Sequence, residues 1–251
     1  MPEYAAQQYW DEVAGHIGVR SDGGGVVAGD DTEFYRLKRS MFMRRFLGPA
    51  LRDAATVLEV GCGPGGNVRW LTEQGKKVVG ADLSETMLRH AGRTVDAEFV
   101  HIDGRTLPFE DRRFEAVFVA TVLQHNPPED ARSLLLEMAR VAERDVHLFE
   151  DTAVLPVHDR SSHWLRRPSW YAATLRDAGF TPVATERLRL SAQEVSAALV
   201  RAAASGGRHE GARATRRHIR AEAAVLPVAR VVDAVVPPAV GLTRMSFRRV
   251  R

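Results

Sequence analysis

The segment VLEVGCGPGGNVRWL, which begins at Val57, constrains the fold of this chain most strongly. An apolar run typical of a buried strand ends in a glycine-rich turn, after which the apolar residues recur at helical spacing. Gly61, Gly63 and Gly66 fit the pattern G-x-G-x-x-G, and Asp82 lies at the end of the next apolar run. Glycines allow close approach of the backbone to a ligand, so the segment predicts a strand–loop–helix unit that binds an adenosine-containing cofactor.

Short apolar runs alternate with helical segments from residue 56 to residue 151. Strands are expected at TVLEVG, KVVGAD, AEFVHID, FEAVFVATV and DVHLFED, and two more at FTPVATERLRL and GLTRMSFRRV. Helices are expected at GGNVRWLTEQG, at SETMLRHAGRT with Ser84 as its N-cap, after the cap residue Asn126, and over 168–178. Because strands alternating with helices form right-handed βαβ units, we predict a Rossmann-like, doubly wound α/β fold with a mostly parallel seven-stranded sheet and helices on both faces.

The regions outside this pattern divide the chain further. Residues 1–50 are expected to form an N-terminal helical lid, with helices over 3–16 and 32–47 joined by a glycine-rich loop over 18–31. The core is expected over 51–190, a helical insertion over 191–238, and the last strand of the core over 239–251.

Composition and charge exclude few classes of function. The 251 residues carry a net charge of +3, but the bias toward arginine, alanine and glycine indicates a GC-rich coding sequence rather than a nucleic-acid face. Six arginines between residues 201 and 220 are typical of a solvated helix face, with phosphate recognition as the minority interpretation. The single cysteine, Cys62, excludes an internal disulfide and a cysteine-based zinc cluster, and no metal is expected.

No secretory signal or membrane span is expected. The N-terminal stretch MPEYAAQQYWDE lacks an apolar centre, and the most apolar stretch, residues 223–242, is interrupted by Arg230, Asp233 and three prolines. We therefore expect a cytoplasmic protein that is a monomer or a homodimer, with no membrane partner.

Two residues in the opening segment favour a ligand without a pyrophosphate. Glu59 precedes the first glycine by two positions, and a carboxylate there repels a pyrophosphate but can hydrogen-bond near an ammonium. Pro64 removes an N–H from the loop, which weakens a phosphate cradle built from N–H donors. The expected ligand has an adenosine, no phosphate and a cationic end.

Four motifs in order resemble those of the class I S-adenosylmethionine-dependent methyltransferases. They are EVGCGPG (59–65), GADLSETML (80–88), HIDGRTLPF (101–109) and FEAVFVATVLQH (114–125), each at the carboxyl end of an expected strand. The resemblance covers about residues 51–180 and implies S-adenosylmethionine as the cofactor. The family's fourth motif often begins with Phe-Asp, whereas this chain has Phe114-Glu115.

Matched motif by motif, the resemblance implies how the methionine end of the cofactor is held. The backbone of Gly61, Cys62 and Gly63 lies against the methionine portion, and Glu59 supports that loop. Ala120, at the end of the fourth strand, offers its carbonyl oxygen to the cofactor's ammonium.

The resemblance also implies the adenosine side of the site. Asp82 binds the two ribose hydroxyls, while Leu83 and Met87 pack on the adenine. Asp103 accepts a hydrogen bond from the adenine amino group, and Gly104 lies beside it.

Residues of the lid are expected to complete the site. The family often uses a basic residue on the helix before the first strand to meet the cofactor's carboxylate, and Lys38 is the candidate, with Arg44 and Arg45 as alternatives. Tyr9 and Trp10 are expected to be aromatic walls over the cofactor mouth.

The acceptor side is expected to lie after the fourth and fifth strands. His125 follows the fourth strand and is the candidate general base, because histidine titrates near neutral pH; a purely structural histidine at this position is an equal alternative. The candidate substrate contacts are Gln124, Glu150, Asp151 and Trp164.

These features predict methyl transfer to a small-molecule acceptor, through a hydroxyl oxygen if His125 is a base, in specialised metabolism such as antibiotic biosynthesis. N-methylation of a small molecule and RNA methylation through the basic insertion are alternatives, although NPPE (126–129) lacks the aromatic residue of base-amine methyltransferase motifs. A nicotinamide-dependent oxidoreductase is disfavoured by Glu59 and Pro64, and a non-catalytic cofactor-binding protein is a fourth alternative.

Overall fold

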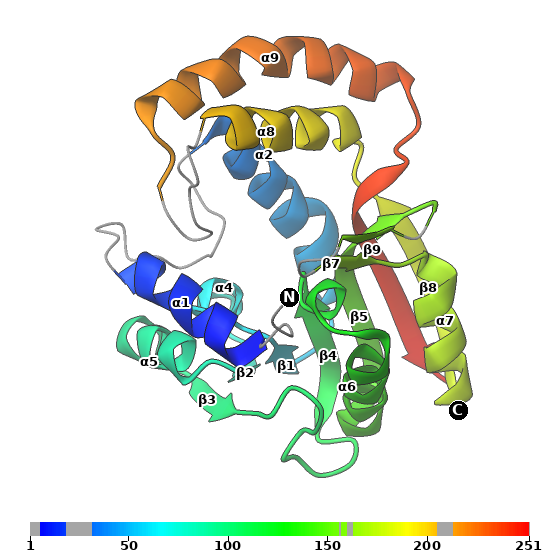
Figure 1. The fold of residues 1–251 in the computed structure, drawn as a ribbon. Coiled ribbons are helices and arrows are strands. Elements are labelled where there is room, and N and C mark those ends of the chain that lie inside the picture. The colour runs from blue at the N-terminus through cyan, green and yellow to red at the C-terminus, as the bar shows by residue number, and fades with distance from the viewer. Residues whose placement is uncertain (1–5, 19–31, 156, 160–162, 205–212, 251) are drawn as a thin grey trace.

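A seven-stranded sheet forms the centre of the chain in this computed structural model, which describes residues 6–18, 32–155, 157–159, 163–204 and 213–250 (Figure 1). The strand order is β3-β2-β1-β4-β5-β9-β8. β1 to β5 pair in parallel, and β9 pairs antiparallel with both β5 and β8. The predicted mostly parallel α/β sheet is therefore confirmed. The strand bounds are β1 Thr56–Val60, β2 Lys77–Asp82, β3 Glu98–His101, β4 Phe114–Ala120, β5 Ala142–Ala153, β8 Phe180–Arg187 and β9 Val240–Arg249.

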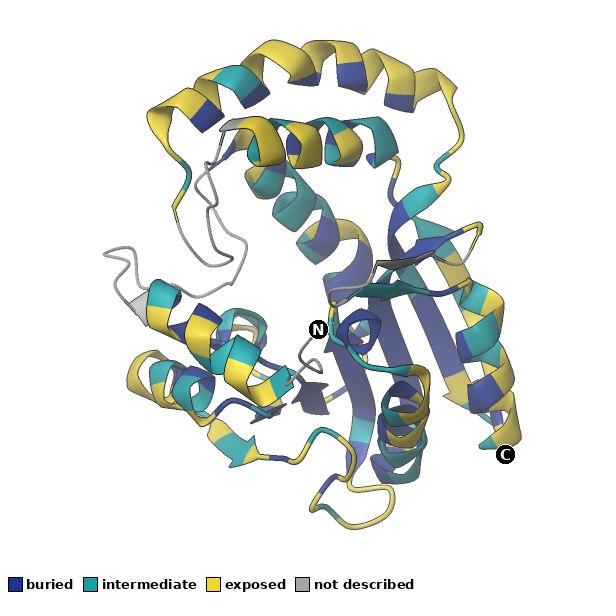
Figure 2. Cartoon of the chain, in the orientation of Figure 1, coloured by how far each residue is buried: buried dark blue, intermediate teal, exposed yellow. Residues whose placement is uncertain are grey.

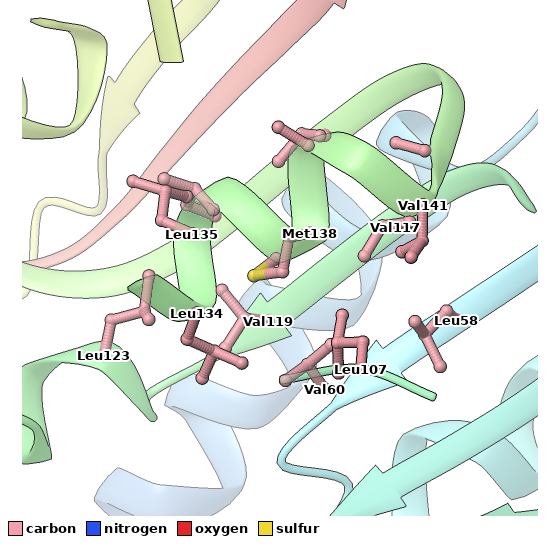
Figure 3. Packing of buried hydrophobic residues seen from close by; sticks show 14 of the residues in the cluster. Leu58, Val60, Leu107, Val117, Val119, Leu123, Leu134, Leu135, Met138 and Val141 are labelled. Carbon is pink, nitrogen blue, oxygen red and sulfur yellow. The ribbon is translucent and has the colours of Figure 1, made fainter. Parts of the chain in front are cut away.

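Helices cover both faces of this sheet, and alternate residues of β1 show how the two faces are filled. Leu58 and Val60 belong to the apolar cluster under α6 and α7, whereas Val57 belongs to the cluster under α2 and α4. Figure 3 shows α6 packed on the sheet, with Leu134 and Met138 beside Val119. The core helices are α4 Gly66–Glu73, α5 Glu85–Thr94, α6 Pro128–Val141 and α7 Pro168–Asp177.

The second lid helix packs with the insertion over one end of the sheet, whereas the first lid helix lies beside α5 (Figure 1). The lid consists of α1 Ala6–Gly18, α2 Glu33–Met41, a π-helix η1 Phe42–Leu47 and α3 Gly48–Ala50; the insertion consists of α8 Ser191–Ala204 and α9 Arg216–Val235. Glu222 of α9 accepts the backbone N–H of Phe34 in α2 at 3.0 Å. Asp233 of α9 accepts the N–H groups of Ala192 and Gln193 in the first turn of α8. These buried carboxylates satisfy helix N-termini and join the three helices, while much of the outer face of α9 is exposed (Figure 2).

Three local features differ from the predictions. A two-stranded hairpin, β6 Val157–Asp159 and β7 His163–Leu165, occupies the region expected to be a loop after β5. The helix expected over 32–47 changes to a π-helix at Phe42. The helix after β4 begins at Pro128, and its N-cap is Pro127 rather than Asn126. Pro127 itself precedes a proline, which disfavours helical backbone angles at Pro127, so the helix cannot begin earlier. Positions 19–31 of the predicted glycine-rich loop lie outside the described residues.

One buried histidine in the sheet predicts an acid-sensitive fold. His147 in β5 is 5% exposed, and its Nδ1 lies 2.9 Å from the Ser246 hydroxyl on β9. Burial lowers the pKa of His147 to about 4, below the value of about 6.5 expected in an unfolded chain. Between these two values the unfolded state binds more protons, so this contribution to stability is present above pH 6.5 and is lost as the pH falls toward 4.

We expect acidification from pH 7 to 4.5 to cost the wild-type protein up to about 3 kcal/mol of unfolding free energy through this histidine. His147→Gln removes the titrating group, so urea unfolding at a series of pH values should show a shallower loss in the variant. An identical pH dependence in both proteins would show that His147 does not carry the effect.

Candidate cofactor and substrate site

A cavity of about 430 Å³ lies where the carboxyl ends of β1, β2 and β4 meet the lid and the insertion. This volume is within the range of small-molecule sites, and the carboxyl edge of a doubly wound sheet is where such sites form. The predicted residues that line it are Trp10, Lys38, Glu59, Gly61, Cys62, Gly63, Asp82, Leu83, Met87, Gly104, Ala120, Gln124, His125 and Asp151. The fold thus brings most of the predicted site together.

Backbone conformation and hydrogen bonds fix the glycine loop that follows β1. Gly61 has a positive φ of 71°, and a Cβ at this position would lie 2.3 Å from Cγ2 of Val122, so no larger side chain fits. The N–H groups of Gly61 and Cys62 both donate to the carbonyl oxygen of Ala81, at 2.7 and 3.0 Å. The loop is therefore fixed against β2, with its bare backbone at the cavity wall.

Asp82 connects this loop to the next helix. Its Oδ2 accepts the N–H of Gly63 and its Oδ1 accepts the N–H of Ser84, both at 2.8 Å. Burial raises the pKa of Asp82, and these two donors oppose the shift. Ser84 caps α5, as predicted, by accepting the N–H of Met87 at 3.1 Å. The Asp82 carboxyl is consequently held in one orientation at the cavity, with oxygen lone pairs left for further donors.

Glu59 lies beneath the glycine loop and is 1% exposed. Its Oε1 accepts a 2.7 Å hydrogen bond from Asn67 of α4, whose own amide oxygen accepts one of 3.0 Å from Arg39 of α2. Burial raises the pKa of Glu59 to about 8. Sequence reasoning missed Asn67 and Arg39, although both line the cavity.

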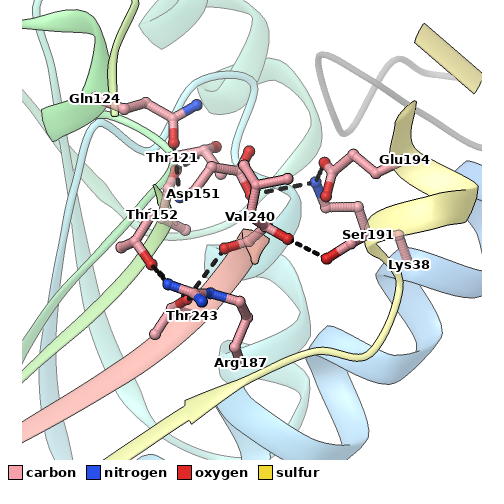
Figure 4. A network of polar contacts seen from close by, with 12 residues as sticks. Lys38, Thr121, Gln124, Asp151, Thr152, Arg187, Ser191, Glu194, Val240 and Thr243 are labelled. Atoms are coloured by element: carbon pink, nitrogen blue, oxygen red, sulfur yellow. Dashed lines mark hydrogen bonds and ion pairs between the residues drawn. The ribbon is translucent and has the colours of Figure 1, made fainter. Parts of the chain in front are cut away.

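The other basic residues of the lid are differently placed. Lys38 forms ion pairs with Asp151 of β5, at 3.5 Å, and with Glu194 of α8 (Figure 4). Burial lowers the pKa of Lys38, but these two carboxylates outweigh it and raise the pKa above its ordinary value. Arg44 and Arg45 are exposed, and neither lines the cavity. Lys38 therefore lines the cavity as predicted, but its ammonium is already shared between two carboxylates that join the lid, the sheet and the insertion.

Asp103 belongs to a turn rather than to the cavity wall. Its carboxylate accepts the N–H groups of Arg105 and Thr106, at 2.8 and 2.7 Å, and these bonds lower its pKa. The flanking residues Ile102 and Gly104 do line the cavity. The residues on either side of Asp103 thus reach the cavity, while the carboxylate that was predicted to accept from adenine closes the turn.

The wall of the cavity that was predicted to hold the acceptor includes a short 3-10 turn, η2 Leu123–His125, which follows β4 after two residues. Gln124 and His125 are 4% and 5% exposed and both line the cavity. The His125 ring lies edge-on to Trp10 of α1, with centroids 5.1 Å apart, and 4.5 Å from the ring of His163 in β7. The unpredicted hairpin therefore adds a second imidazole to this wall.

Glu150 holds this turn in place from below. It is fully buried and accepts the backbone N–H groups of Val122, Leu123 and Gln124, at 3.0 to 3.2 Å. Burial raises its pKa to about 7. Glu150 was predicted as a substrate contact, but it does not line the cavity, because all of its hydrogen bonds go to the chain it supports.

Two aromatic candidates also stand back from the cavity. Tyr9 packs edge-on against Trp10, with centroids 5.1 Å apart, and Trp164 lies in the hairpin; neither lines the cavity. In the described part of the chain, no three His, Cys, Asp or Glu side chains form a group that could hold a metal ion. No described helix combines the length and apolarity needed to cross a bilayer.

Comparison with known proteins agrees with this geometry. A family model described as a methyltransferase domain matches residues 57–145, which run from β1 through β5 and include the glycine loop, Asp82 and His125. Residues 57–145 of the chain therefore form a methyltransferase domain. S-adenosylmethionine is therefore the cofactor expected for this domain.

Relatives of this methyltransferase domain support the same assignment over part of their length. A demethylmenaquinone methyltransferase of Corynebacterium urealyticum is 40% identical over 108 residues, which is 43% of this chain and 44% of that protein. The chain thus matches less than half the length of this relative.

Two solved structures share the fold at low sequence identity. The geranyl diphosphate C-methyltransferase of Streptomyces coelicolor is 17% identical, covers 98% of this chain and 100% of its own, and gives a TM-score of 0.63. The [4+2]-cyclase SpnF is 19% identical, covers 97% and 95%, and gives 0.64. Because a cyclase has the same fold, the fold alone does not define the reaction of this domain.

Proposed function

We propose that this protein transfers the methyl group of S-adenosylmethionine to a small-molecule acceptor. One observation carries the proposal: the glycine-loop backbone, Asp82 and Glu59 face the same cavity as Gln124, His125 and Asp151. The first group has the chemistry to hold an adenosine and an ammonium, and the second can hold a nucleophile. Methyl transfer from a sulfonium is an in-line displacement, so holding an acceptor against the cofactor supplies much of the catalysis.

The residues present fit this cofactor. The carboxylate of Asp82 can accept both ribose hydroxyls, and the apolar side chains of Leu83, Met87 and Ile102 can enclose the adenine. At the methionine end, the Ala120 carbonyl and Glu59 are acceptors for the ammonium, and Arg39 is a cation for the carboxylate. Lys38 stays a candidate for that carboxylate, in competition with Asp151 and Glu194.

A hydroxyl acceptor is our proposal for the second substrate. A neutral alcohol is a weak nucleophile, and His125 is placed to take its proton as the methyl group is transferred. Gln124 and Asp151 lie on the same wall and can orient the acceptor by hydrogen bonds. Residues of α1, α2 and α8 line the cavity, and its volume of about 430 Å³ suits a small molecule. A role in specialised metabolism is part of this proposal.

RNA methylation is the second candidate because the insertion is basic. Arg216, Arg217 and Arg220 are exposed on α9, whereas Arg201 stacks on Tyr35 at 4.9 Å and lines the cavity. Of these four arginines, the first three could meet a polyanion outside the site. Salt-dependent RNA binding that is lost when these three arginines become glutamine would favour this candidate over a small acceptor.

A thermal-shift comparison tests the cofactor class. At a concentration about 100-fold above its dissociation constant, S-adenosylhomocysteine should stabilise the fold by about 2.7 kcal/mol, or roughly 5–10 °C for a chain of this size. NADH at the same concentration should leave Tm unchanged, because Pro64 removes from the glycine loop an N–H donor that a pyrophosphate would use. Stabilisation by NADH without stabilisation by S-adenosylhomocysteine would contradict the proposal.

The acceptor itself is tested by mass spectrometry after incubation with S-adenosylmethionine. The panel should contain matched hydroxyl, amine and thiol compounds, hydroxylated specialised metabolites and transfer RNA. A gain of 14 Da on a hydroxyl compound is the expected result. Methylation confined to amines or to RNA would replace the oxygen acceptor with one of the alternatives.

A further inference from the structure

The C-terminal half of α9 exposes a row of valines. Val228, Val231 and Val235 lie at positions i, i+3 and i+7, on one side of the helix, and their side chains are 66–76% exposed. Val236, which follows the helix, is also more than half exposed. The outer face of α9 is exposed over much of its length (Figure 2). A contiguous group of exposed apolar side chains is uncommon on a soluble domain and marks an interaction surface.

A second segment of the chain extends this row of valines. After α9 the chain turns toward β9, and the carbonyl oxygen of Ala239 accepts the N–H of Val154 at 3.0 Å. Val154 and Leu155 come directly after β5, and both are more than half exposed. These residues form one aliphatic surface that runs from α9 to the end of β5. Its members are Val154, Leu155, Val228, Val231, Val235 and Val236.

Three arginines border the aliphatic surface, since each donates a hydrogen bond to a backbone carbonyl within it or beside it. The bonds are Arg167 Nε to Val154 at 2.8 Å, Arg187 Nη1 to Pro238 at 3.0 Å and Arg189 Nη1 to Ala234 at 3.4 Å. In the part of the chain that the structure describes, no ion pair joins any of these three guanidinium groups to a carboxylate. The carbonyls therefore hold three positive charges at the edge of an apolar patch.

The other charges nearby do not cancel this positive border. The two carboxylates of α9, Glu222 and Asp233, are buried on the inner side of the helix. Arg230 on α9 is paired with Glu33 of α2. Three further arginines, Arg216, Arg217 and Arg220, are exposed toward the start of α9. An aliphatic patch with a cationic edge is complementary to a surface that is apolar inside and carries phosphate groups outside.

We propose that the aliphatic surface and its arginine border dock this protein on an anionic lipid bilayer, with α9 lying in the plane of the interface. The aliphatic side chains enter the boundary between headgroups and acyl chains, and the guanidinium groups pair with lipid phosphates. Asp151, which lines the cavity, lies three residues before Val154, or about 10 Å along an extended chain. Docking therefore brings the acceptor wall of the cavity close to the bilayer.

A second copy of this chain fits the aliphatic surface less well than an anionic bilayer does. In a two-fold dimer the same patch meets itself, so the arginine border of one copy lies against that of the other. The buried carboxylates Glu222 and Asp233 are not available to pair with those arginines. Repulsion between like charges opposes such a dimer, whereas lipid phosphates attract the same groups.

Co-sedimentation with vesicles tests the docking. The full chain is mixed with vesicles of phosphatidylcholine, or of phosphatidylcholine with about 30% phosphatidylglycerol, at increasing salt concentration. We expect binding to the anionic vesicles to be at least about tenfold tighter than to the neutral ones, and to weaken as salt screens the arginines.

Two double variants separate the aliphatic contribution from the charged one. Val231→Ser with Val235→Ser should weaken binding to the anionic vesicles by about tenfold, because two side chains no longer leave water favourably. Arg167→Gln with Arg189→Gln should weaken it by about 25-fold, at a factor of about five for each arginine.

Matched controls change the same residue types elsewhere on the surface. Val250→Ser lies just beyond the far end of β9, and Arg93→Gln lies in the last turn of α5; both side chains are exposed. The controls should bind vesicles like the wild type. Since every substituted side chain other than that of Arg189 and Arg167 in its carbonyl contact is free of described hydrogen bonds, Tm should change little in all variants.

The outcomes assign the surface to one partner. Equal binding to neutral and anionic vesicles, or wild-type binding in both double variants, would overturn the inference. A dimer in analytical ultracentrifugation that dissociates in Val231→Ser with Val235→Ser, without vesicle binding, would assign the surface to a second copy. RNA binding without vesicle binding would assign it to a nucleic acid. The binding of S-adenosylhomocysteine is measured separately, so the proposed function does not depend on any of these results.

Discussion

His125→Ala is expected to lower kcat for methyl transfer to a hydroxyl acceptor by about two to four orders of magnitude. The imidazole lines the cavity between Trp10 and His163, and it belongs to the short turn that follows β4. Single-turnover transfer of a labelled methyl group from S-adenosylmethionine, with the acceptor found in the screen, measures the loss.

The binding constant of S-adenosylhomocysteine separates catalysis from folding in this variant. It should stay within about twofold of the wild type, because the ring lies on the acceptor side rather than against the glycine loop. His163→Asn, which changes the neighbouring ring, should have a smaller effect on kcat. Wild-type turnover in His125→Ala would exclude the base, and a matching loss of cofactor affinity would indicate a structural histidine.

Asp82→Ala is expected to weaken binding of S-adenosylhomocysteine by at least about 100-fold. The variant loses the acceptor for the ribose hydroxyls, and hydrogen bonds to a charged group contribute about 1.5–3 kcal/mol each, where 1.4 kcal/mol is a factor of ten. It also leaves the N–H groups of Gly63 and Ser84 without their present acceptor, so the loop should loosen and Tm should fall.

Asp82→Asn tests the same carboxylate with less disturbance, since the amide keeps one acceptor oxygen. Its affinity should lie between those of the wild type and the alanine variant. Asp96→Asn, an exposed acid between α5 and β3, is the surface control and should bind like the wild type. Wild-type affinity in both Asp82 variants, measured by calorimetry, would show that the ribose does not bind at this end of β2.

The sheet could be predicted from the sequence because its signal is local. Each strand from β1 to β5 is an apolar run that ends at a polar or glycine-rich turn, and the helices between them have matching spacing and caps. The β6–β7 hairpin was missed because its segment is rich in His, Arg and Trp, without the alternation of a half-buried strand. The π-helix at Phe42 places Phe42 and Phe46 against Phe149 of β5, a contact between distant residues that no local pattern encodes.

The candidate site likewise has a part that could be predicted from the sequence and a part that could not. Glycines and carboxylates at strand ends, such as Gly61 and Asp82, could be placed because the parallel sheet brings those ends together. The pairing of Lys38 with Asp151 and Glu194 could not, since it joins residues far apart in the chain through the packing of α8. Glu150 was placed at the correct strand end, but whether its side chain faces a ligand or the backbone beneath depends on the path of the next turn.

A crystal structure of the protein with S-adenosylhomocysteine is the most direct test of the central claim that this cavity holds the methyl donor. We expect the ribose hydroxyls within hydrogen-bond distance of Asp82, the adenine between Leu83 and Gly104, the ammonium near the Ala120 carbonyl and Glu59, and the sulfur facing His125. Ligand bound elsewhere, or an adenosine turned away from Asp82, would contradict the account.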